Sequence, residues 1–398
     1  MKGWKSLSLG EVMQLEYGKP LAPEDRNPTG LYPAYGANGE KDRTDRFYRD
    51  QPSIIVGRKG SAGEITLTEE KYWPLDVTYF AEFDRQRHDL KFLYHLLTTL
   101  DLPSLAKGVK PGINRNEVYA VPVMVPPLPE QRRIVAIIDE AFEGIAIAKA
   151  NAEKNLQNAR ELFDGHLQAV FSQLGHGWVS KTVQQWVDDG VLAKPQDGNH
   201  GEIHPTKADY VDVGVPFIMA ADMVDGVVDT EGCRFIAKEQ ASALRIGFAK
   251  TGDVLLSHKG TIGRVAILET GDEYVILTPQ VTYYRSLDSN RLFNGFLYYC
   301  LLSPEFQAAM NRIAGAGSTR AYIGITRQLD LQMALPRSDV QRETAARLRF
   351  IDEASNRLSG VYKAKLAALD ELKNALLQQA FSGKLSAARA TDVMEAVA

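Results

Sequence analysis

The sequence is poor in cysteine. Cys233 and Cys300 are the only two among 398 residues, and no Cys-x-x-Cys pair is present. Neither a disulfide framework nor a zinc knuckle is therefore supported. No apolar run reaches the length of a membrane span, and the N-terminus lacks the apolar segment of a signal peptide. We therefore expect a cytoplasmic protein that does not enter a membrane.

An excess of positive charge is also missing. The chain has 46 lysines and arginines against 50 aspartates and glutamates, which gives a net charge of −4. This balance counts mildly against DNA binding, although a local basic patch can bind phosphate within an acidic chain. An apolar content of 44% and a charged content of 24% are those of a globular protein. At this length, two domains are the default expectation.

Catalytic motifs are absent as well. Gly57-Arg58-Lys59-Gly60-Ser61-Ala62-Gly63 is not G-x-x-x-x-G-K-[ST], and it connects two predicted strands rather than a strand and a helix. His200-Gly201-Glu202-Ile203-His204 departs from H-E-x-x-H, and its glycine does not suit a zinc-binding helix. No G-x-S-x-G elbow occurs. Val125-Pro126-Pro127-Leu128 lacks the amide and the ring of a methyltransferase Asn-Pro-Pro-aromatic motif. The sequence therefore predicts a non-catalytic chain without a metal site.

What the sequence does contain is one stretch that occurs twice, at residues 129–172 and again from about residue 339 to 382. Both ends recur at an offset of 210: Gln131-Arg132 as Gln341-Arg342, and Leu167-Gln168-Ala169-Val170-Phe171-Ser172 as Leu377-Gln378-Gln379-Ala380-Phe381-Ser382. No residue has been gained or lost between the two ends. A packed helix explains this, since one extra residue would rotate everything after it by about 100°. The repeats therefore predict two equal long helices.

Apolar and small residues in both copies alternate at spacings of four and three, which is typical of a coiled-coil seam. The first seam is rich in alanine and the second carries leucine and tyrosine, so small residues can interlock with large ones. Two core helices of one globule are the alternative, but globular helices average only about 11–12 residues. The residues assigned to the coiled coil and to partner contacts are Ile134, Ile138, Ile145, Leu162, Leu348, Ile351, Leu358, Leu369 and Leu372.

A strand-rich segment precedes each long helix, and the order of motifs within it repeats. A strand, a glycine-rich turn and a returning strand occupy residues 53–67 and again residues 253–267. The predicted fold class is α+β, with two strand-rich domains in tandem, each followed by a long helix, and the two helices forming an antiparallel coiled coil. The predicted divisions are residues 1–128 and 174–338 for the globular domains, 129–173 and 339–385 for the helices, and 386–398 for a C-terminal tail.

Two turns of the form Lys-Gly-small-x-Gly, at Lys59 and Lys259, are the best candidates for binding. Their glycines let the backbone approach a partner closely, and neighbouring cations can meet phosphates or base edges. Alternatively, the glycines only satisfy a tight turn and the lysines are solvated. A basic loop before each long helix and a loop specific to the second copy are weighed in the same way. The candidate DNA-binding residues are Arg58, Lys59, Gly60, Lys107, Lys110, Arg115, Asn199, His200, His258, Lys259, Gly260, Arg264, Arg320, Tyr322 and Arg327.

This organisation resembles the specificity subunit of Type I restriction–modification systems along essentially the whole chain. The resemblance rests on the two Lys-Gly-[Ser/Thr]-x-Gly turns, on the two repeated helix ends, and on the helix starts Val125-Pro126-Pro127-Leu128-Pro129-Glu130-Gln131-Arg132-Arg133-Ile134 and Leu335-Pro336-Arg337-Ser338-Asp339-Val340-Gln341-Arg342. The second start departs from the first by replacing Pro-Leu-Pro-Glu-Gln with Arg-Ser-Asp-Val-Gln. The two starts therefore need not contact partners identically.

The resemblance implies two target-recognition domains that each read one half of a bipartite site in double-stranded DNA. It implies helices that space these domains and dock two modification subunits, which carry S-adenosylmethionine and methylate adenine. Motor–nuclease subunits would add cleavage, and this chain itself would hold no cofactor. Because the globular parts differ more than the helices, we expect an asymmetric target. The alternatives are a DNA-reading subunit for a fused methylase–nuclease and a coiled-coil scaffold that does not bind DNA.

Overall fold

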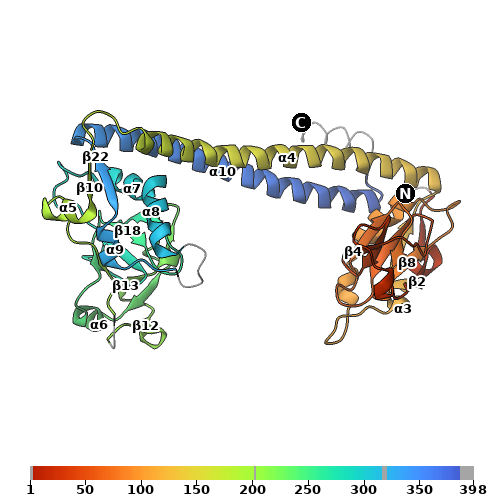
Figure 1. Cartoon of the computed structure of the whole chain (residues 1–398). Coiled ribbons are helices and arrows are strands. Elements are labelled where there is room, and N and C mark those ends of the chain that lie inside the picture. Colours follow the sequence, from red (N-terminus) through yellow and green to blue (C-terminus); the bar gives the residue numbers. More distant parts are fainter. Residues whose placement is uncertain (1–2, 201–202, 316–320, 386–398) are drawn as a thin grey trace. The chain divides into compact units, whose positions relative to one another are not determined.

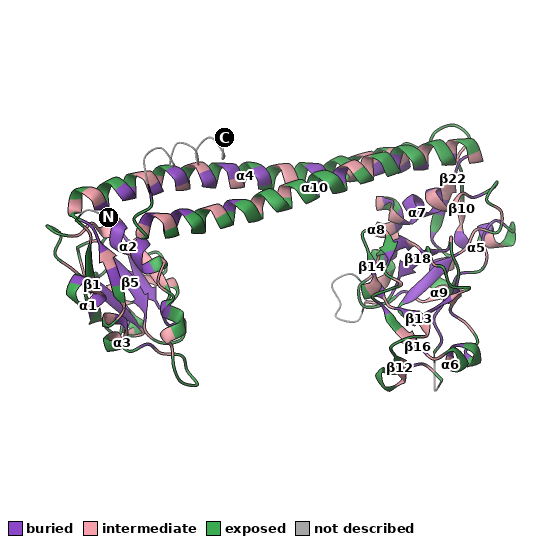
Figure 2. Cartoon of the chain, turned by 180° about the vertical axis from the view of Figure 1, so that it is seen from behind, coloured by how far each residue is buried: buried purple, intermediate pink, exposed green. Residues whose placement is uncertain are grey.

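The computed structural model describes residues 3–200, 203–315 and 321–385 (Figure 1). The tail predicted for residues 386–398 lies outside this part of the chain. The structure divides into two compact units, Met1–Lys154 with Tyr362–Ala398, and Asn155–Val361. Two long helices, α4 (Leu128–Ser172) and α10 (Ser338–Phe381), each contribute to both units. Figure 2 shows the buried residues gathered mainly in the sheets of each unit.

The first unit is built around an antiparallel sheet in the order β2-β8-β5-β6. Its strands are β2 (Gln14–Tyr17), β8 (Thr78–Glu82), β5 (Ser53–Gly57) and β6 (Ile65–Thr68). A second sheet, β4-β3-β7, consists of β3 (Tyr32–Gly36), β4 (Gly39–Thr44) and β7 (Trp73–Pro74), and β1 (Lys5–Ser8) pairs with β9 (Pro122–Val125). The helices are α1 (Leu9–Val12), α2 (Leu90–Thr98) and α3 (Arg115–Tyr119), with 3-10 turns η1 (Pro23–Asp25) and η2 (Leu102–Leu105).

Strand β5 is the centre of this unit because both of its faces are buried. Ile54 and Val56 belong to the cluster that includes Phe92 of α2, whereas Ile55 packs in a separate cluster with Tyr72. Successive side chains of a strand point to opposite faces, so an uninterrupted apolar strand needs cover on both sides. The turn that follows β5 is therefore anchored on a rigid strand.

The second unit contains two larger sheets, in the orders β11-β21-β18-β19-β15-β14 and β12-β16-β13-β20-β17, and the pair β10–β22. Its strands are β10 (Val179–Thr182), β11 (Gln196–Asp197), β12 (Tyr210–Val211), β13 (Val215–Ile218), β14 (Met223–Val224), β15 (Val227–Val228), β16 (Arg234–Ile236), β17 (Phe248–Ala249), β18 (Val254–Ser257), β19 (Val265–Ile267), β20 (Val275–Leu277), β21 (Val281–Tyr284) and β22 (Gln332–Leu335). Its other helices are α5 (Val183–Asp188), α6 (Lys238–Ala243), α7 (Asn294–Leu302), α8 (Pro304–Ala314) and α9 (Ile325–Leu329), with turns η3 (Lys207–Asp209) and η4 (Ala220–Asp222).

The two units share one plan. Strand β18 pairs antiparallel with β19 and β21, as β5 does with β6 and β8. The pair β10–β22 repeats the pair β1–β9, and each pair contains the strand that leads into a long helix. A parallel pairing of β13 with β20 likewise repeats that of β3 with β7. The second unit adds strands around this shared framework, so the two globular parts differ most there.

The two long helices run antiparallel to each other within each unit. In the first unit, Ile134, Ile138 and Ile145 of α4 share one buried cluster with Leu369 of α10, and the Lys149 ammonium lies 2.7 Å from the Asp370 carboxylate. In the second unit, Leu167 of α4 shares a cluster with Leu348 of α10, and the Ser355 hydroxyl donates to the carbonyl oxygen of Ala159. The predicted α+β fold with an antiparallel coiled coil is confirmed.

Two residues assigned to the seam do not lie in it. Leu162 and Leu358 are 46% and 42% exposed, while Ile351 and Leu372 are half-buried. Burial instead steps by four residues, from Ala159 to Phe163 and from Ser355 to Ser359. A strict alternation of four and three averages 3.5 residues per turn, so a helix of 3.6 residues per turn drifts away from it. One additional spacing of four residues in each helix returns the following residues to the contact between the two helices.

Within the described ranges, no helix combines the length and apolarity that a membrane crossing needs. The same residues contain no group of three or more His, Cys, Asp or Glu side chains placed to hold a metal ion.

Candidate nucleic-acid interface

In the first unit, the structure brings together two segments that the sequence analysis singled out separately. The turn after β5 and the basic loop at residues 107–115 pair through their backbones. The Gly60 amide donates to the Pro111 carbonyl at 2.9 Å, and the Ile113 amide donates to the Arg58 carbonyl at 3.1 Å. An isolated bridge joins Lys59 to Gly112 between these two bonds. The predicted turn and the predicted loop are therefore one surface.

The second unit repeats this arrangement at equivalent positions. The Gly260 amide donates to the Ala321 carbonyl at 3.1 Å, and the Ile323 amide donates to the His258 carbonyl at 3.0 Å. Lys259 forms an isolated bridge with Tyr322, as Lys59 does with Gly112. Although the two loops share little sequence, the backbone pairing that presents each lysine is the same.

The glycines at the tips of these turns are conformationally required. Gly60 and Gly260 have φ angles of 83° and 77°, which L-amino acids with a side chain rarely adopt. A Cβ atom at either position would meet nothing within 4 Å, so both tips face open space. Both glycines are therefore needed for the backbone conformation of their turns. The open space beside them also allows a partner to approach the backbone.

An exposed aromatic residue, which the sequence analysis missed, organises the basic side chains of the first unit. The Arg58 guanidinium lies 5.3 Å from the ring centroid of Tyr17, and the Arg115 guanidinium lies 5.1 Å from the same ring. Arg58 also donates twice to the Asp76 carbonyl, at 3.1 and 2.6 Å, and Arg115 donates to the Leu15 carbonyl at 3.4 Å. The ring and the carbonyls hold both cations in place, and Tyr17 is itself 48% exposed.

The lysines of the first unit are not equivalent. Lys59 and Lys110 are exposed and have no carboxylate within ion-pair distance among the described residues. Lys107 is exposed too, but its ammonium lies 2.7 Å from the Glu117 carboxylate. Lys59 and Lys110 are therefore better placed to meet phosphates than Lys107.

The prediction that His258 and Asn199 bind DNA is wrong, because both side chains are buried. The His258 side chain is fully buried, and its Nδ1 lies 2.9 Å from the Ile323 carbonyl oxygen. Burial lowers the pKa of His258, so its imidazole stays neutral. Asn199 is only 4% exposed, and its amide donates to the His200 carbonyl at 3.1 Å. Both side chains make their contacts inside the unit, and neither reaches the surface that DNA could contact.

The other candidates of the second unit lie at the surface. Lys259, Arg264 and Arg327 are exposed, and Tyr322 is 48% exposed with its ring centroid 5.7 Å from that of His258. Arg264 donates to the Ala220 carbonyl at 2.9 Å, which fixes one end of its guanidinium. Arg320 lies outside the described residues. DNA contact by the exposed residues stays a prediction.

His200, like Lys107, is an exposed candidate with a carboxylate beside it. Its Nε2 lies 2.8 Å from Asp197 Oδ2, and its side chain is 51% exposed. This contact occupies Nε2, so only Nδ1 of the imidazole is left for a hydrogen bond to a partner.

The chain is similar to known proteins in sequence and in fold. Residues 1–158 match the family described as the Type I restriction modification DNA specificity domain. The chain is 22% identical over 405 residues to the Type I restriction enzyme MjaVIII specificity subunit of Methanocaldococcus jannaschii, covering 96% of this chain and 93% of that one.

Two solved structures share the fold. One was solved in work on complex assembly and conformational transition of the type I R-M system, with a TM-score of 0.74, 21% identity, and coverage of 97% of this chain and 99% of that one. The other is the HsdS subunit from Thermoanaerobacter tengcongensis, with a TM-score of 0.56, 20% identity and coverage of 97% and 98%. Together these matches show that residues 1–158 resemble the Type I restriction modification DNA specificity domain and that the whole chain shares the fold of the two solved structures.

Proposed function

We propose that this chain is a non-catalytic subunit that reads a bipartite site in double-stranded DNA and docks two modification subunits of a Type I complex. The observation that carries the proposal is the repeated pairing of a Lys-Gly turn with the loop before a long helix, which presents Lys59 and Lys259 in the same way. Residues 1–128 and 174–338 are the two proposed readers. S-adenosylmethionine would be held by the modification subunits, motor–nuclease subunits could join them, and the complex would work on DNA in the cytoplasm.

We further propose that the two half-sites differ in sequence. The position before the repeated lysine holds Arg58 in one unit and His258 in the other, and only Arg58 presents its cation at the surface. Tyr17 gives the first unit a ring between two guanidiniums. Because base readout depends on the few side chains that reach a groove, unlike surfaces are expected to read unlike sequences.

Methylation mapping at base resolution tests the proposal. DNA from cells that express this chain with its neighbouring candidate methyltransferase is compared with DNA from cells that lack only this chain. A new methyl-adenine at a split, asymmetric motif with a fixed spacer is the expected result. A symmetric motif would contradict the prediction of unlike half-sites. The absence of new methylation from a complex shown to assemble would favour a scaffold that does not read DNA.

The helices are proposed to fix the spacer between the half-sites. Four residues inserted into α4 or α10 would lengthen that helix by about 6 Å and rotate its seam by about 40° relative to its partner. We expect such an insertion to change the spacer in the methylated motif or to abolish binding. An unchanged spacer would reject this role of the helices.

A further inference from the structure

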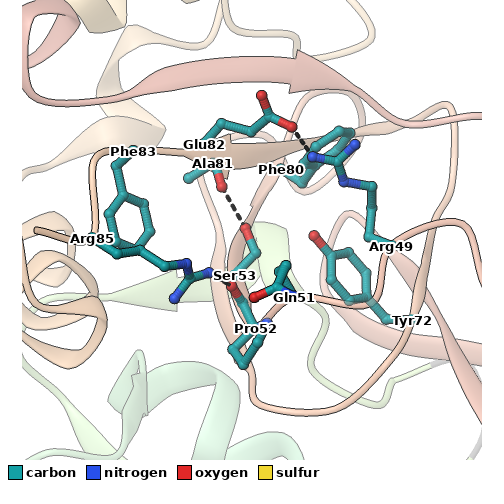
Figure 3. Close-up of a pocket in the computed structure, with 10 residues that line it drawn as sticks. All are labelled: Arg49, Gln51, Pro52, Ser53, Tyr72, Phe80, Ala81, Glu82, Phe83 and Arg85. Atoms are coloured by element: carbon teal, nitrogen blue, oxygen red, sulfur yellow. Dashed lines mark hydrogen bonds and ion pairs between the residues drawn. The ribbon is translucent and has the colours of Figure 1, made fainter.

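A recess in the first unit, which the proposed DNA-reading surface does not use, is lined by two arginines and three aromatic rings. It has a volume of about 230 Å³. Figure 3 shows Arg85 and Arg49 entering from opposite sides, with Ser53 between them. The remaining lining comes from Gln51, Pro52, Tyr72, Phe80, Ala81, Glu82 and Phe83.

Contacts hold both arginines in place. Among the described residues, Arg49 has a carboxylate as ion-pair partner and Arg85 has none. The Arg49 guanidinium pairs with the Glu82 carboxylate and lies 4.7 Å from the ring centroid of Phe80. The Arg85 guanidinium donates to the Pro52 carbonyl and lies 4.9 Å from the ring centroid of Phe83. No carboxylate of the described residues lies within ion-pair distance of Arg85. The recess therefore has an excess of one positive charge.

Tyr72 supplies a proton donor at the wall of the recess. The residue is 1% exposed, and its backbone pairs with that of Arg49 through bonds of 2.9 and 3.0 Å. Burial raises the pKa of the Tyr72 phenol, so the hydroxyl keeps its proton at neutral pH. Ser53 lies beside it, but the Ser53 hydroxyl already donates to the Ala81 carbonyl at 2.6 Å. The Tyr72 phenol and the Arg85 guanidinium therefore both line the recess as possible hydrogen-bond donors.

We propose that this recess binds the carboxylate of an acidic side chain from a partner protein, with Arg85 as the ion-pair partner and Tyr72 as a hydrogen-bond donor. A planar carboxylate accepts two hydrogen bonds from the fork of a guanidinium. An aspartate or glutamate side chain carries its charge on a flexible stem, which can extend into a concave site. Given the proposed function, on which this assignment rests, the modification subunit is that partner.

The position of the recess argues against DNA phosphate as the ligand. Ser53 begins β5, whereas Arg58 and Lys59 follow the end of this five-residue strand. The two ends of this strand are about 13 Å apart at about 3.3 Å per residue, and Arg58 and Lys59 lie beyond the second end. In addition, the Glu82 carboxylate stands at the recess and would repel a polyanion, whereas the excess of one positive charge suits a single carboxylate.

A thermal-shift titration with N-acetyl-glutamate amide, against N-acetyl-glutamine amide at matched ionic strength, tests the site without any partner. The glutamate compound should raise the melting temperature of the wild-type chain by about 1–2 °C more than the glutamine compound, because a ligand that binds only the folded state stabilises it. Arg85→Gln should abolish the difference, Tyr72→Phe should reduce it, and Glu82→Gln should enlarge it. No difference in the wild type, or a shift with inorganic phosphate but not with glutamate, would overturn the proposal.

Association with the modification subunit, measured with the same variants, tests the assignment of the partner. Arg85→Gln should weaken association about tenfold and leave DNA affinity unchanged. Arg87→Gln is the matched control, since Arg87 lies on the same loop and pairs with Asp84 at 3.3 Å. Loss of DNA affinity with unchanged association would reject the carboxylate site. A wild-type chain that does not associate at all would refute the proposed function, while the glutamate-dependent shift would still establish the recess as a carboxylate site.

Discussion

Gln131 and Gln341 occupy equivalent positions in the two long helices, and their buried side-chain amides make the same three hydrogen bonds. The Oε1 atom of Gln131 accepts from the Asp89 amide at 2.8 Å. Its Nε2 donates to the carbonyls of Arg87 at 3.0 Å and Pro126 at 2.9 Å. One side chain therefore joins the loop before α2, the end of β9 and the first turn of α4.

Gln341 does the same in the second unit. Its Oε1 accepts from the Phe293 amide at 2.9 Å, and its Nε2 donates to the carbonyls of Arg291 at 2.9 Å and Pro336 at 2.8 Å. This amide fixes the start of α10 against the loop before α7. The repeated Gln-Arg pair in the sequence thus marks a joint between each globular part and its helix.

Gln131→Leu is expected to destabilise the first unit by about 2–4 kcal/mol, because one backbone donor and two backbone acceptors lose their buried partner. Thermal or urea unfolding measures this loss. Gln168→Leu is the control, since Gln168 is exposed on the same helix. A change below about 0.5 kcal/mol for Gln131→Leu, similar to that of an ordinary surface substitution, would contradict this role.

The repeated sequence predicts the two long helices but not the contacts that these two glutamines make. The constant offset of 210 predicted two rigid helices, because helix packing tolerates no insertion. The reason for the glutamine itself could not be predicted, because its partners lie 42 and 44 residues upstream on a loop. A local sequence pattern indicates the type of secondary structure. The contacts of a buried amide depend on residues that only folding brings together.

Two glycines in the turn after β5 provide a matched test of backbone constraint. Gly60 and Gly63 have similar φ angles of 83° and 88°. A Cβ on Gly60 meets nothing within 4 Å, whereas a Cβ on Gly63 would lie 2.5 Å from the Pro103 nitrogen. Gly60→Ala should therefore cost only the backbone strain of about 1–2 kcal/mol. Gly63→Ala should cost clearly more, since the chain at η2 must move.

Melting temperatures of the two alanine variants check this order. A third variant, Gly263→Ala, should fall between them, because its new Cβ would meet the flexible end of Gln307 at 2.3 Å rather than backbone. Equal melting temperatures for all three variants would show that φ alone sets the cost.

The candidate site could be predicted from sequence only in part. The spacing of Lys59 and Lys259 identified two equivalent turns, and the structure shows both turns with the same backbone pairing. The burial of His258 could not be predicted, because it depends on the loop that covers it from Ile323 onward. Tyr17 was missed for a similar reason, since it joins Arg58 only through the pairing of β2 with β8 and β8 with β5.

His258 predicts a specific dependence of stability on pH. Burial lowers its pKa below the ordinary value of 6.5, with Asp197 partly offsetting this effect and His200 adding to it. The unfolded chain therefore binds a proton before the folded chain does as pH falls. The contribution of His258 to the free energy of unfolding should be constant above about pH 6.5. As the pH falls below this value, the free energy of unfolding should decrease.

His258→Gln should remove this part of the pH dependence, which amounts to at most about 1.4 kcal/mol per pH unit for one proton. Urea unfolding between pH 7 and 5.5 measures the slope. A shallower slope should remain, because burial also lowers the pKa values of His88 and His95. His176→Gln, at an exposed position, serves as the control. Identical slopes for His258→Gln and the wild type would refute the assignment.

Lys59→Ala and Lys259→Ala test the two turns as phosphate contacts. Each lysine is exposed on a turn whose backbone is tied to the neighbouring loop. Removal of one phosphate contact should lower the slope of log affinity against log salt by about 0.9. DNA affinity measured between 50 and 200 mM salt gives this slope for each variant and for the double variant.

The double variant should lose about twice the slope of either single variant, because the two turns belong to different units and have no shared partner. Lys363→Ala is the control, since Lys363 is exposed on α10 and belongs to neither turn. Assembly with the modification subunit should be unchanged in every variant. If the double variant binds DNA with the wild-type slope, the turns are conformational features alone, and Arg58 and Arg115 beside Tyr17 become the better candidates for phosphate contact.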